Sequence, residues 1–193
     1  MKHGVLALGL LCGACGGSEP KVVVGTGASP FTGVDAYAVA SEVSGAALSA
    51  DGSASAAFTG RSIEVVVSTA PGACARIGAR TYKASTTTVA ILVMNGAPVP
   101  ISPGAYGVGN PRSGDPTPFA AVTSYTSDAA CAGGTPRVSV SGAVTFSAID
   151  AGEVSGSLDV VLDDGTRVTG SFGAPVCNAA EQNLAGVTFA CTP

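Results

Sequence analysis

Hydrophobic and polar residues alternate most regularly over residues 138–172, where two short segments that end in glycine interrupt the alternation. These interruptions lie at residues 150–152 and 163–165. A three-residue hairpin loop is commonly a type I turn followed by a left-handed residue, a conformation that glycine adopts without a side-chain clash. The pattern therefore predicts three consecutive antiparallel strands joined by two three-residue loops.

The length of these loops sets the register of the predicted meander. Three-residue loops pair Ile149 with Glu153 and Leu162 with Thr166. A two-residue second turn would mix polar and apolar side chains on each face, because side chains alternate with a period of two. With three-residue loops, one face is apolar and consists of Val140, Val144, Phe146, Ala148, Val154, Leu158, Val160, Leu162, Val168 and Phe172.

The chain upstream of the meander shows the same alternation more weakly. Val, Ala, Ser, Thr and Gly dominate and Trp is absent, a mixture that favours strands and turns over helices. We expect an all-β domain, an antiparallel β-sandwich with a partly closed β-barrel as the alternative. The further predicted strands are 36–43, 47–50, 54–58, 62–68, 87–93, 106–108 and 119–125, with turns at 51–52 and 95–96.

Four cysteines lie in the predicted domain, at Cys74, Cys131, Cys177 and Cys191. An even number of cysteines in an oxidising compartment indicates disulfides, here two. A zinc site needs closely spaced ligand pairs, whereas these four cysteines are widely spaced and have no histidine beside them. We therefore expect two disulfides and no metal site.

The predicted meander favours one way of pairing these cysteines. Cys131 precedes its first strand and Cys177 follows its third, so the two lie at opposite ends of the sheet, roughly 33 Å apart. Bridged Cα atoms lie within about 7 Å of each other. An antiparallel strand at 187–190 would bring Cys191 to Cys131. The preferred pairing is Cys131 with Cys191 and Cys74 with Cys177, and the second choice is Cys74 with Cys131 and Cys177 with Cys191.

The first fourteen residues have the layout of an export signal. Lys2 and His3 form a charged start, residues 4–11 carry no polar side chain, and Gly13 and Ala14 are small residues just before Cys15. A membrane-spanning helix needs roughly 20 apolar residues, so this segment is too short to anchor the chain by itself.

The end of this segment resembles the lipobox of bacterial lipoproteins, in which a small residue pair precedes the cysteine that receives diacylglycerol. Gly13, Ala14 and Cys15 match, whereas Cys12 stands where the family prefers Leu. The resemblance implies lipidation of Cys15, palmitate included, and membrane attachment through that anchor. Gly16, in place of the Asp that retains lipoproteins in the inner membrane, implies the outer membrane. Ordinary secretion after cleavage near Ala14, to the periplasm or beyond, is the alternative.

The expected organisation is a signal peptide at 1–14, a lipid-anchored flexible tether at 15–30 and a single β domain at 31–193, which is long enough to bury a core. The formal net charge is −4, and removal of Lys2 with the leader makes it one unit more negative. The basic residues are spread along the chain and form no cationic stripe, so we expect no nucleic-acid partner.

The sequence lacks the residues that most familiar catalytic mechanisms need. The only histidine is His3, which is lost with the signal, so Ser-His-Asp and Cys-His mechanisms have no base. Ser18 and Lys21 have the Ser-x-x-Lys spacing but lie in the tether, where nothing buries the lysine. Asp163 and Asp164 lack the ligand series of a calcium loop and predict a plain turn. We expect no catalytic residue and no cofactor.

Two features leave room for other functions. The turn-rich segment at 98–118 is a candidate contact surface, because loops often carry binding functions, although a plain surface connection is the first interpretation. Two carboxylates that meet in space would allow glycoside hydrolysis, but the missing Trp removes the strongest sugar platform. The candidate carboxylates are Asp35, Glu42, Asp51, Glu64, Asp128, Glu153 and Asp159.

The chain as a whole resembles uncharacterised predicted bacterial lipoproteins of the myxobacterial type. The matching parts are residues 15–17, 71–74 and 103–106, and the run from Gly142 to Cys177. This resemblance implies no known activity. The leading interpretation is a non-enzymatic envelope lipoprotein whose β domain binds a partner, such as an unidentified envelope protein, or has a structural role. The alternative is a carboxylate-dependent hydrolase or a sugar-binding module, which a pocket joining two acidic residues would favour.

Overall fold

The computed structural model describes residues 21–24, 31–48, 54–109, 117–178 and 189–193. The predicted signal peptide, Cys15 and the predicted turn at residues 51–52 lie outside the described residues. Strands make up nearly all of the described secondary structure, and one short helix accompanies them. The prediction of an all-β protein is therefore confirmed.

Within the described ranges, ten strands form one sheet with antiparallel pairings, in the order β2-β1-β11-β10-β9-β8-β6-β4-β3, and β7 pairs with β9 outside this path. The strand predicted at 36–43 and the first two residues of the one predicted at 47–50 belong to the single strand β3, and residues 49–50 lie outside the described residues. The strands predicted at 54–58 and 62–68 both belong to β4. The bounds are β1 (Lys21–Val24), β2 (Phe31–Thr32), β3 (Asp35–Leu48), β4 (Ala54–Ser68), β6 (Thr87–Asn95), β7 (Gly104–Gly107), β8 (Phe119–Thr126), β9 (Arg137–Ile149), β10 (Glu153–Leu162) and β11 (Arg167–Pro175).

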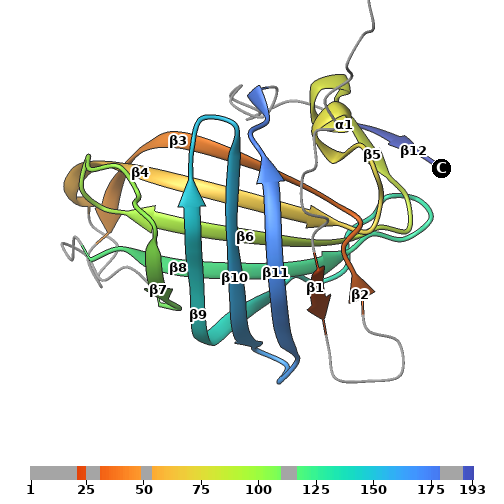
Figure 1. Ribbon diagram of the computed structural model, residues 1–193. Helices are drawn as coiled ribbons and strands as arrows, with labels where there is room; N and C mark the ends of the chain where they lie inside the picture. Colours follow the sequence, from red (N-terminus) through yellow and green to blue (C-terminus); the bar gives the residue numbers. More distant parts are fainter. Residues whose placement is uncertain (1–20, 25–30, 49–53, 110–116, 179–188) are drawn as a thin grey trace, which may run out of the picture.

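The sheet bends back on itself and nearly closes into a barrel (Figure 1), which is the alternative of the two predicted architectures. Strands β9, β10 and β11 run across β3, β4, β6 and β8 in the view of Figure 1, and β9 pairs with both β10 and β8. Closure occurs where Ala38 of β3 meets Val176, and the Cys177 backbone nitrogen donates a hydrogen bond of 2.8 Å to the Ala38 carbonyl. Strand β1 covers another part of the same β11 edge.

Strand β1 lies in the region that the sequence predicts to be tether. Its residues pair with β11 from Lys21 opposite Ser171 to Val24 opposite Val168, and Val22 is fully buried. Three consecutive valines explain the strand, because β-branched side chains favour a pleated, half-buried surface. The sheet therefore begins ten residues before the predicted start of the domain at residue 31.

The inward side chains of both layers fill the barrel with an apolar core. Valine dominates it, and the rings of Phe146 and Phe172 pack edge to face with centroids 6.0 Å apart. Between these rings lies Gly156, which pairs with both phenylalanines. A Cβ at Gly156 would approach the Thr145 carbonyl oxygen to 2.2 Å, so the backbones leave no space for a side chain.

The predicted register is confirmed through the middle of the meander, where Leu158 pairs with Val144 and Val160 with Val168. The second loop also forms as predicted, with Gly165 in the left-handed conformation at a φ of 83°. The first loop is wrong by one residue, since Ile149 pairs with Val154 in place of Glu153. A register shift between Ser155 and Gly156 accounts for this difference.

A bulge at the start of β9 overturns the predicted position of Val140. The pairing shifts between Val161 and Leu162, so that Leu162 lies opposite Ser139, and Gly142 has a φ of 108°. An extra residue reverses the facing of everything beyond it. Val140 is consequently 60% exposed instead of buried, and Val138 is 47% exposed. Ala148, also predicted to be in the core, is only half-buried.

A short helix and a small second sheet lie against one end of the barrel (Figure 1). These are α1 (Ala73–Ala79) and the parallel pair β5 (Thr81–Lys83) and β12 (Ala190–Thr192). The sequence predicted an antiparallel return strand at 187–190. Where the structure describes this segment the prediction is wrong, because β12 pairs with β5 and runs parallel to it. Residues 187–188 lie outside the described residues.

Candidate functional site

A pocket of about 320 Å³ lies on the outer face of the barrel. Strands β3, β4, β6 and β8 form its floor through the side chains that alternate with the core residues. Its walls come from α1, β5 and the loop after β8. The lining residues are Tyr37, Val66, Ser68, Ala73, Arg76, Ile77, Thr81, Tyr82, Lys83, Thr86, Thr88, Tyr125, Ser127, Cys131 and Gly133.

Cross-strand pairs arrange the floor in rows. Tyr37 of β3 lies opposite Val66 of β4, and in the next row Ser68 of β4 lies opposite Thr88 of β6, which lies opposite Tyr125 of β8. Paired β-branched and aromatic side chains stabilise such rows. The hydrogen-bonded ladder of the sheet therefore holds the hydroxyl groups of the floor at fixed spacing.

The helix α1 is held on the floor by local hydrogen bonds at both ends. Gly72, with a φ of 75°, precedes it and has no side chain for capping, and Asp35 of β3 takes that role by accepting a hydrogen bond of 2.6 Å from the Ala73 nitrogen. At the other end Arg80 is left-handed and its backbone N–H donates to the carbonyls of Arg76 and Ile77. This short helix has no strong apolar periodicity, which is why the sequence did not predict it.

The first disulfide fixes α1 to the closing edge of the barrel. Cys74 of α1 is bonded to Cys177, and their Cα atoms are 5.7 Å apart. This is the preferred pairing, and it is confirmed. Cys177 is 1% exposed and belongs to a small apolar cluster outside the barrel, which also contains Tyr37, Val66, Ala73, Cys74 and Ile77.

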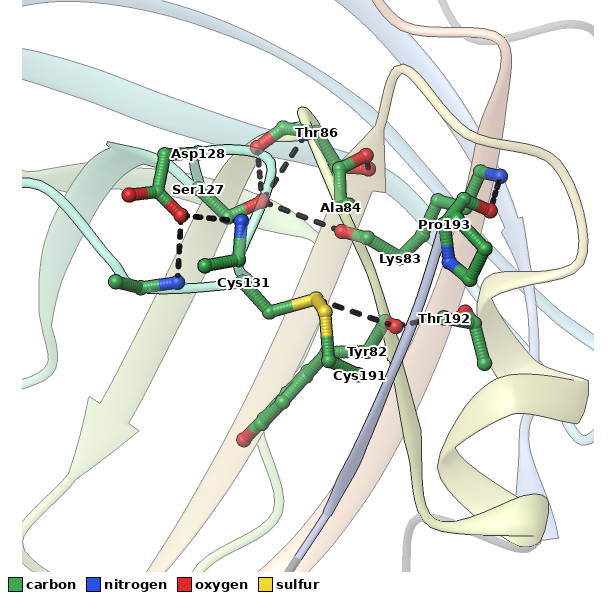
Figure 2. The surroundings of a disulfide bond; sticks show 12 residues. Tyr82, Lys83, Ala84, Thr86, Ser127, Asp128, Cys131, Cys191, Thr192 and Pro193 are labelled. Atoms are coloured by element: carbon green, nitrogen blue, oxygen red, sulfur yellow. Dashed lines mark hydrogen bonds between the residues drawn. A yellow bond between two sulfur atoms is a disulfide. The ribbon is translucent and has the colours of Figure 1, made fainter.

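The second disulfide fixes the opposite wall of the pocket (Figure 2). Cys131 is bonded to Cys191 of β12, with 5.7 Å between the Cα atoms, so this preferred pairing is confirmed too. The Thr192 hydroxyl donates to the Tyr82 carbonyl at 2.8 Å, which joins β12 to β5 a second time. Asp128 shapes the loop before Cys131, since one carboxylate oxygen accepts hydrogen bonds from the backbone nitrogens of residues 130 and 132.

Ser127 ties that loop to the segment after β5. Its hydroxyl oxygen accepts a hydrogen bond of 3.1 Å from the Thr86 nitrogen and lies 3.2 Å from the Lys83 carbonyl, to which it donates. Figure 2 shows these contacts converging beside the disulfide. The Cys131 sulfur lies 3.6 Å from the Tyr82 carbonyl, a contact only, because a disulfide sulfur carries no hydrogen. The two covalent bonds and this network define the shape of the pocket.

Three of the four tyrosines in the chain line the pocket, namely Tyr37, Tyr82 and Tyr125. Burial raises the pKa of Tyr37 and of Tyr125, and the nearby Glu64 carboxylate raises both further, so both hydroxyls stay protonated. Tyr37 is 7% exposed, and its hydroxyl makes no hydrogen bond within the described part of the chain. Since no buried side-chain oxygen there lacks a partner, the Tyr37 hydroxyl must reach the open space of the pocket. Tyr82 stacks on Phe189 with ring centroids 4.5 Å apart.

The charges that line the pocket are both positive. The Arg76 guanidinium donates to the Ala70 carbonyl at 3.0 Å and to the Pro71 carbonyl, and Lys83 donates to an oxygen of Pro193. No carboxylate is among the lining residues. Glu64 stands beside the floor, and burial raises the pKa of its carboxyl group. The lining residues therefore carry two positive charges, and the Glu64 carboxylate lies just outside them.

A second pocket, of about 520 Å³, lies where β3 and β4 meet the segment before β7. It contains one carboxylate, Glu42, which forms an ion pair of 2.6 Å with Arg61. Pro100 and Ile101 also line it, so part of the predicted contact segment at 98–118 does reach a pocket. Residues 110–116 of that segment lie outside the described residues.

The candidate carboxylates of the sequence do not meet in either of these pockets. Asp51 lies outside the described residues, Glu64 stands beside the first pocket, and Glu153 begins β10. Across the described ranges, no group of three or more His, Cys, Asp or Glu residues is placed to hold a metal ion. The other carboxylates support local structure: Asp35 at α1, Glu42 with Arg61, Asp128 in its loop and Asp159 with Arg167.

The tyrosine pocket itself was not predicted from the sequence. Its three tyrosines lie up to 88 positions apart along the chain, and although Tyr37 and Tyr125 fall in predicted strands, no prediction placed these strands side by side. Composition was the one signal that could have pointed to the tyrosines. In a chain that lacks tryptophan, tyrosine is the aromatic residue that also carries a polar group.

Comparison with known proteins adds no assignment, since no family model, curated protein or solved structure matches the chain. Among the helices that the structure describes, none is long and apolar enough to cross a membrane.

Proposed function

We propose that this chain is a bacterial envelope lipoprotein, anchored through Cys15 and placed in the outer membrane, whose β domain is a non-enzymatic binding protein. The anchor and the location rest on the sequence of residues 1–16 and its resemblance to a lipobox. The binding role rests on the tyrosine pocket, whose lining offers hydrogen-bonding side chains and no pair of carboxylates.

One observation carries the binding role: both disulfides border the same pocket. Cys131 lines it directly, and the Cys74–Cys177 bond packs against Tyr37 and Val66 of its floor. A disulfide stabilises chiefly by restricting the unfolded chain, and it can do so from many places in a fold. Two covalent bonds around one pocket hold its walls in place before a ligand arrives, which lowers the ordering cost of binding.

The sugar-binding form of the alternative function gains support from the same pocket. Tyrosine offers a flat apolar ring with a polar tip, and three of them meet here in place of the missing tryptophan. A carboxylate-dependent hydrolase gains no such support, because neither described pocket contains two carboxylates.

Mass spectrometry of the protein purified from bacterial envelopes, with and without reduction, tests the proposed anchor and compartment together. We expect loss of residues 1–14, a diacylglycerol and acyl modification on Cys15, and both disulfides intact. Cys15→Ala should abolish the modification, while the matched control Cys12→Ala should retain it. An intact leader with free thiols at the four downstream cysteines would disprove export and lipidation.

A further inference from the structure

The lining of the tyrosine pocket favours a polyhydroxylated ligand. Eight of the fifteen lining residues carry a hydroxyl group. Ser68, Thr86 and Ser127 already hydrogen-bond within the protein, but within the described residues the Tyr37 hydroxyl makes no such bond, and an apolar ligand would leave it unpaired at a cost in free energy. The volume of about 320 Å³ lies at the lower end of the range for small-molecule sites, which is about 300–1,000 Å³. A single sugar ring suits this volume better than a chain of sugars.

The charge of the pocket favours an anionic group on that ring. Arg76 donates two hydrogen bonds to carbonyls, which leaves three of its five N–H donors and its full positive charge for a ligand. In the described part of the chain, arginine ion pairs form at Arg61, Arg137 and Arg167, and Arg76 forms none. Hydrogen bonds between a guanidinium and a carboxylate are among the stronger ones in proteins.

The cation and the tyrosine hydroxyls converge on the same space. Tyr37 of β3 and Arg76 of α1 both line this pocket, one from the floor and the other from the wall above it. The Tyr37 hydroxyl already reaches the open pocket. Tyr82 is 47% exposed at the wall, so its ring has apolar surface available beside these polar groups.

Building on the binding role proposed above, we propose that the pocket binds a small sugar acid, a monosaccharide that carries one carboxylate. Arg76 binds the carboxylate, the hydroxyls of Tyr37 and Tyr125 bind ring hydroxyls, and the Tyr82 ring packs against the sugar carbons. Lys83 adds positive charge at the rim. A neutral sugar lacks the carboxylate that Arg76 would bind, and a carboxylate without hydroxyls leaves the Tyr37 hydroxyl unpaired.

Isothermal titration of the full, disulfide-bonded chain with three probes tests this assignment. The probes are sodium glucuronate, glucose as the neutral analogue, and benzoate as a carboxylate without hydroxyl groups. We expect glucuronate to bind at least tenfold more tightly than either of the others. Galacturonate and a short oligogalacturonate, compared with each other, distinguish the source, since tighter binding of the oligomer indicates a polysaccharide end and weaker binding indicates a free sugar acid.

Arg76→Gln removes the charge and keeps two N–H donors, and Arg80→Gln is the matched control from the exposed end of α1, outside the lining. We expect Arg76→Gln to abolish the preference for glucuronate over glucose and Arg80→Gln to change it less than twofold. Thermal unfolding checks that both variants fold. Should Arg76→Gln fail to fold, Tyr37→Phe keeps the ring and should weaken glucuronate binding several-fold.

Equal binding of glucose and glucuronate, equal binding of benzoate, or no binding of any probe would overturn the assignment. So would an unchanged preference in a folded Arg76→Gln variant. These results are independent of the mass of the mature protein, so a wrong ligand class is distinguishable from a wrong compartment.

Discussion

The two disulfides close loops of different length, which sets a first estimate of what each contributes to the free energy of unfolding. Cys74–Cys177 spans 103 positions and Cys131–Cys191 spans 60. Loss of loop-closure entropy corresponds to about 4.7 kcal/mol for the longer loop and about 4.3 kcal/mol for the shorter one. Loop length alone therefore makes the two bonds nearly equal.

Burial distinguishes the expected contributions of the two disulfides to the free energy of unfolding. Cys177 is 1% exposed and packs in the outer apolar cluster, whereas Cys191 is exposed. Replacing both cysteines of a pair with alanine removes two sulfurs, and at the buried site this resembles the loss of a buried methylene, about 0.8 kcal/mol. We expect C74A/C177A to lose about 1 kcal/mol more than C131A/C191A from loop length and burial together.

Equilibrium urea unfolding of the two double variants measures this difference, and thiol titration verifies that the remaining disulfide is intact in each. The loss of a cross-link expands the unfolded chain. The free energy of unfolding should therefore fall more steeply with urea concentration in both variants. Equal losses of stability, or a larger loss for C131A/C191A, would refute the argument that burial decides the order.

Three further predictions test the packing of the barrel and its wall. Gly156→Ala should destabilise the fold by about 3 kcal/mol, because its Cβ would meet a backbone carbonyl at 2.2 Å, while Gly152→Ala, whose Cβ has only a side-chain atom at 3.8 Å, should stay within about 0.5 kcal/mol in chemical unfolding. Val144→Ser should destabilise by about 2 kcal/mol and Val140→Ser by less than about 0.5 kcal/mol, and the reverse order would contradict the bulge. Burial raises the pKa of Glu64, so its contribution is fully present below the unfolded value of 4.5 and is lost as the pH rises through the raised folded value. Glu64→Gln should therefore raise the stability at pH 7 relative to the parent more than at pH 4, and an equal effect at both would argue against that shift.

The alternation of hydrophobic and polar residues in the meander predicted the register through the middle of β9, β10 and β11. Alternation and loop length placed Leu158 opposite Val144, and the length of the meander disfavoured a bond between Cys131 and Cys177. Both conclusions depend only on the period of two and the rise along a strand. The reversal at Val140 was not predictable in this way, because the unusual backbone at Gly142 does not alter the pattern of residue types.

The candidate site was less accessible to sequence reasoning because tertiary packing creates it. Its floor needs the register of four strands, and its wall needs the helix that Asp35 caps from a distant strand. The sequence offered carboxylates as candidate catalytic groups. In the structure, most of them support loops or pair with arginines. The tyrosines carry no local spacing that marks a pocket.

The early start of the sheet has a mechanical consequence for a lipid-anchored protein. If Cys15 carries the lipid as proposed, only residues 16–20 separate it from Lys21, the first residue of β1. Even a fully stretched connection of this length reaches roughly 20 Å. The domain would lie close to the bilayer and rotate about a short connection. The molecules that it contacts first would therefore be those at the headgroup surface.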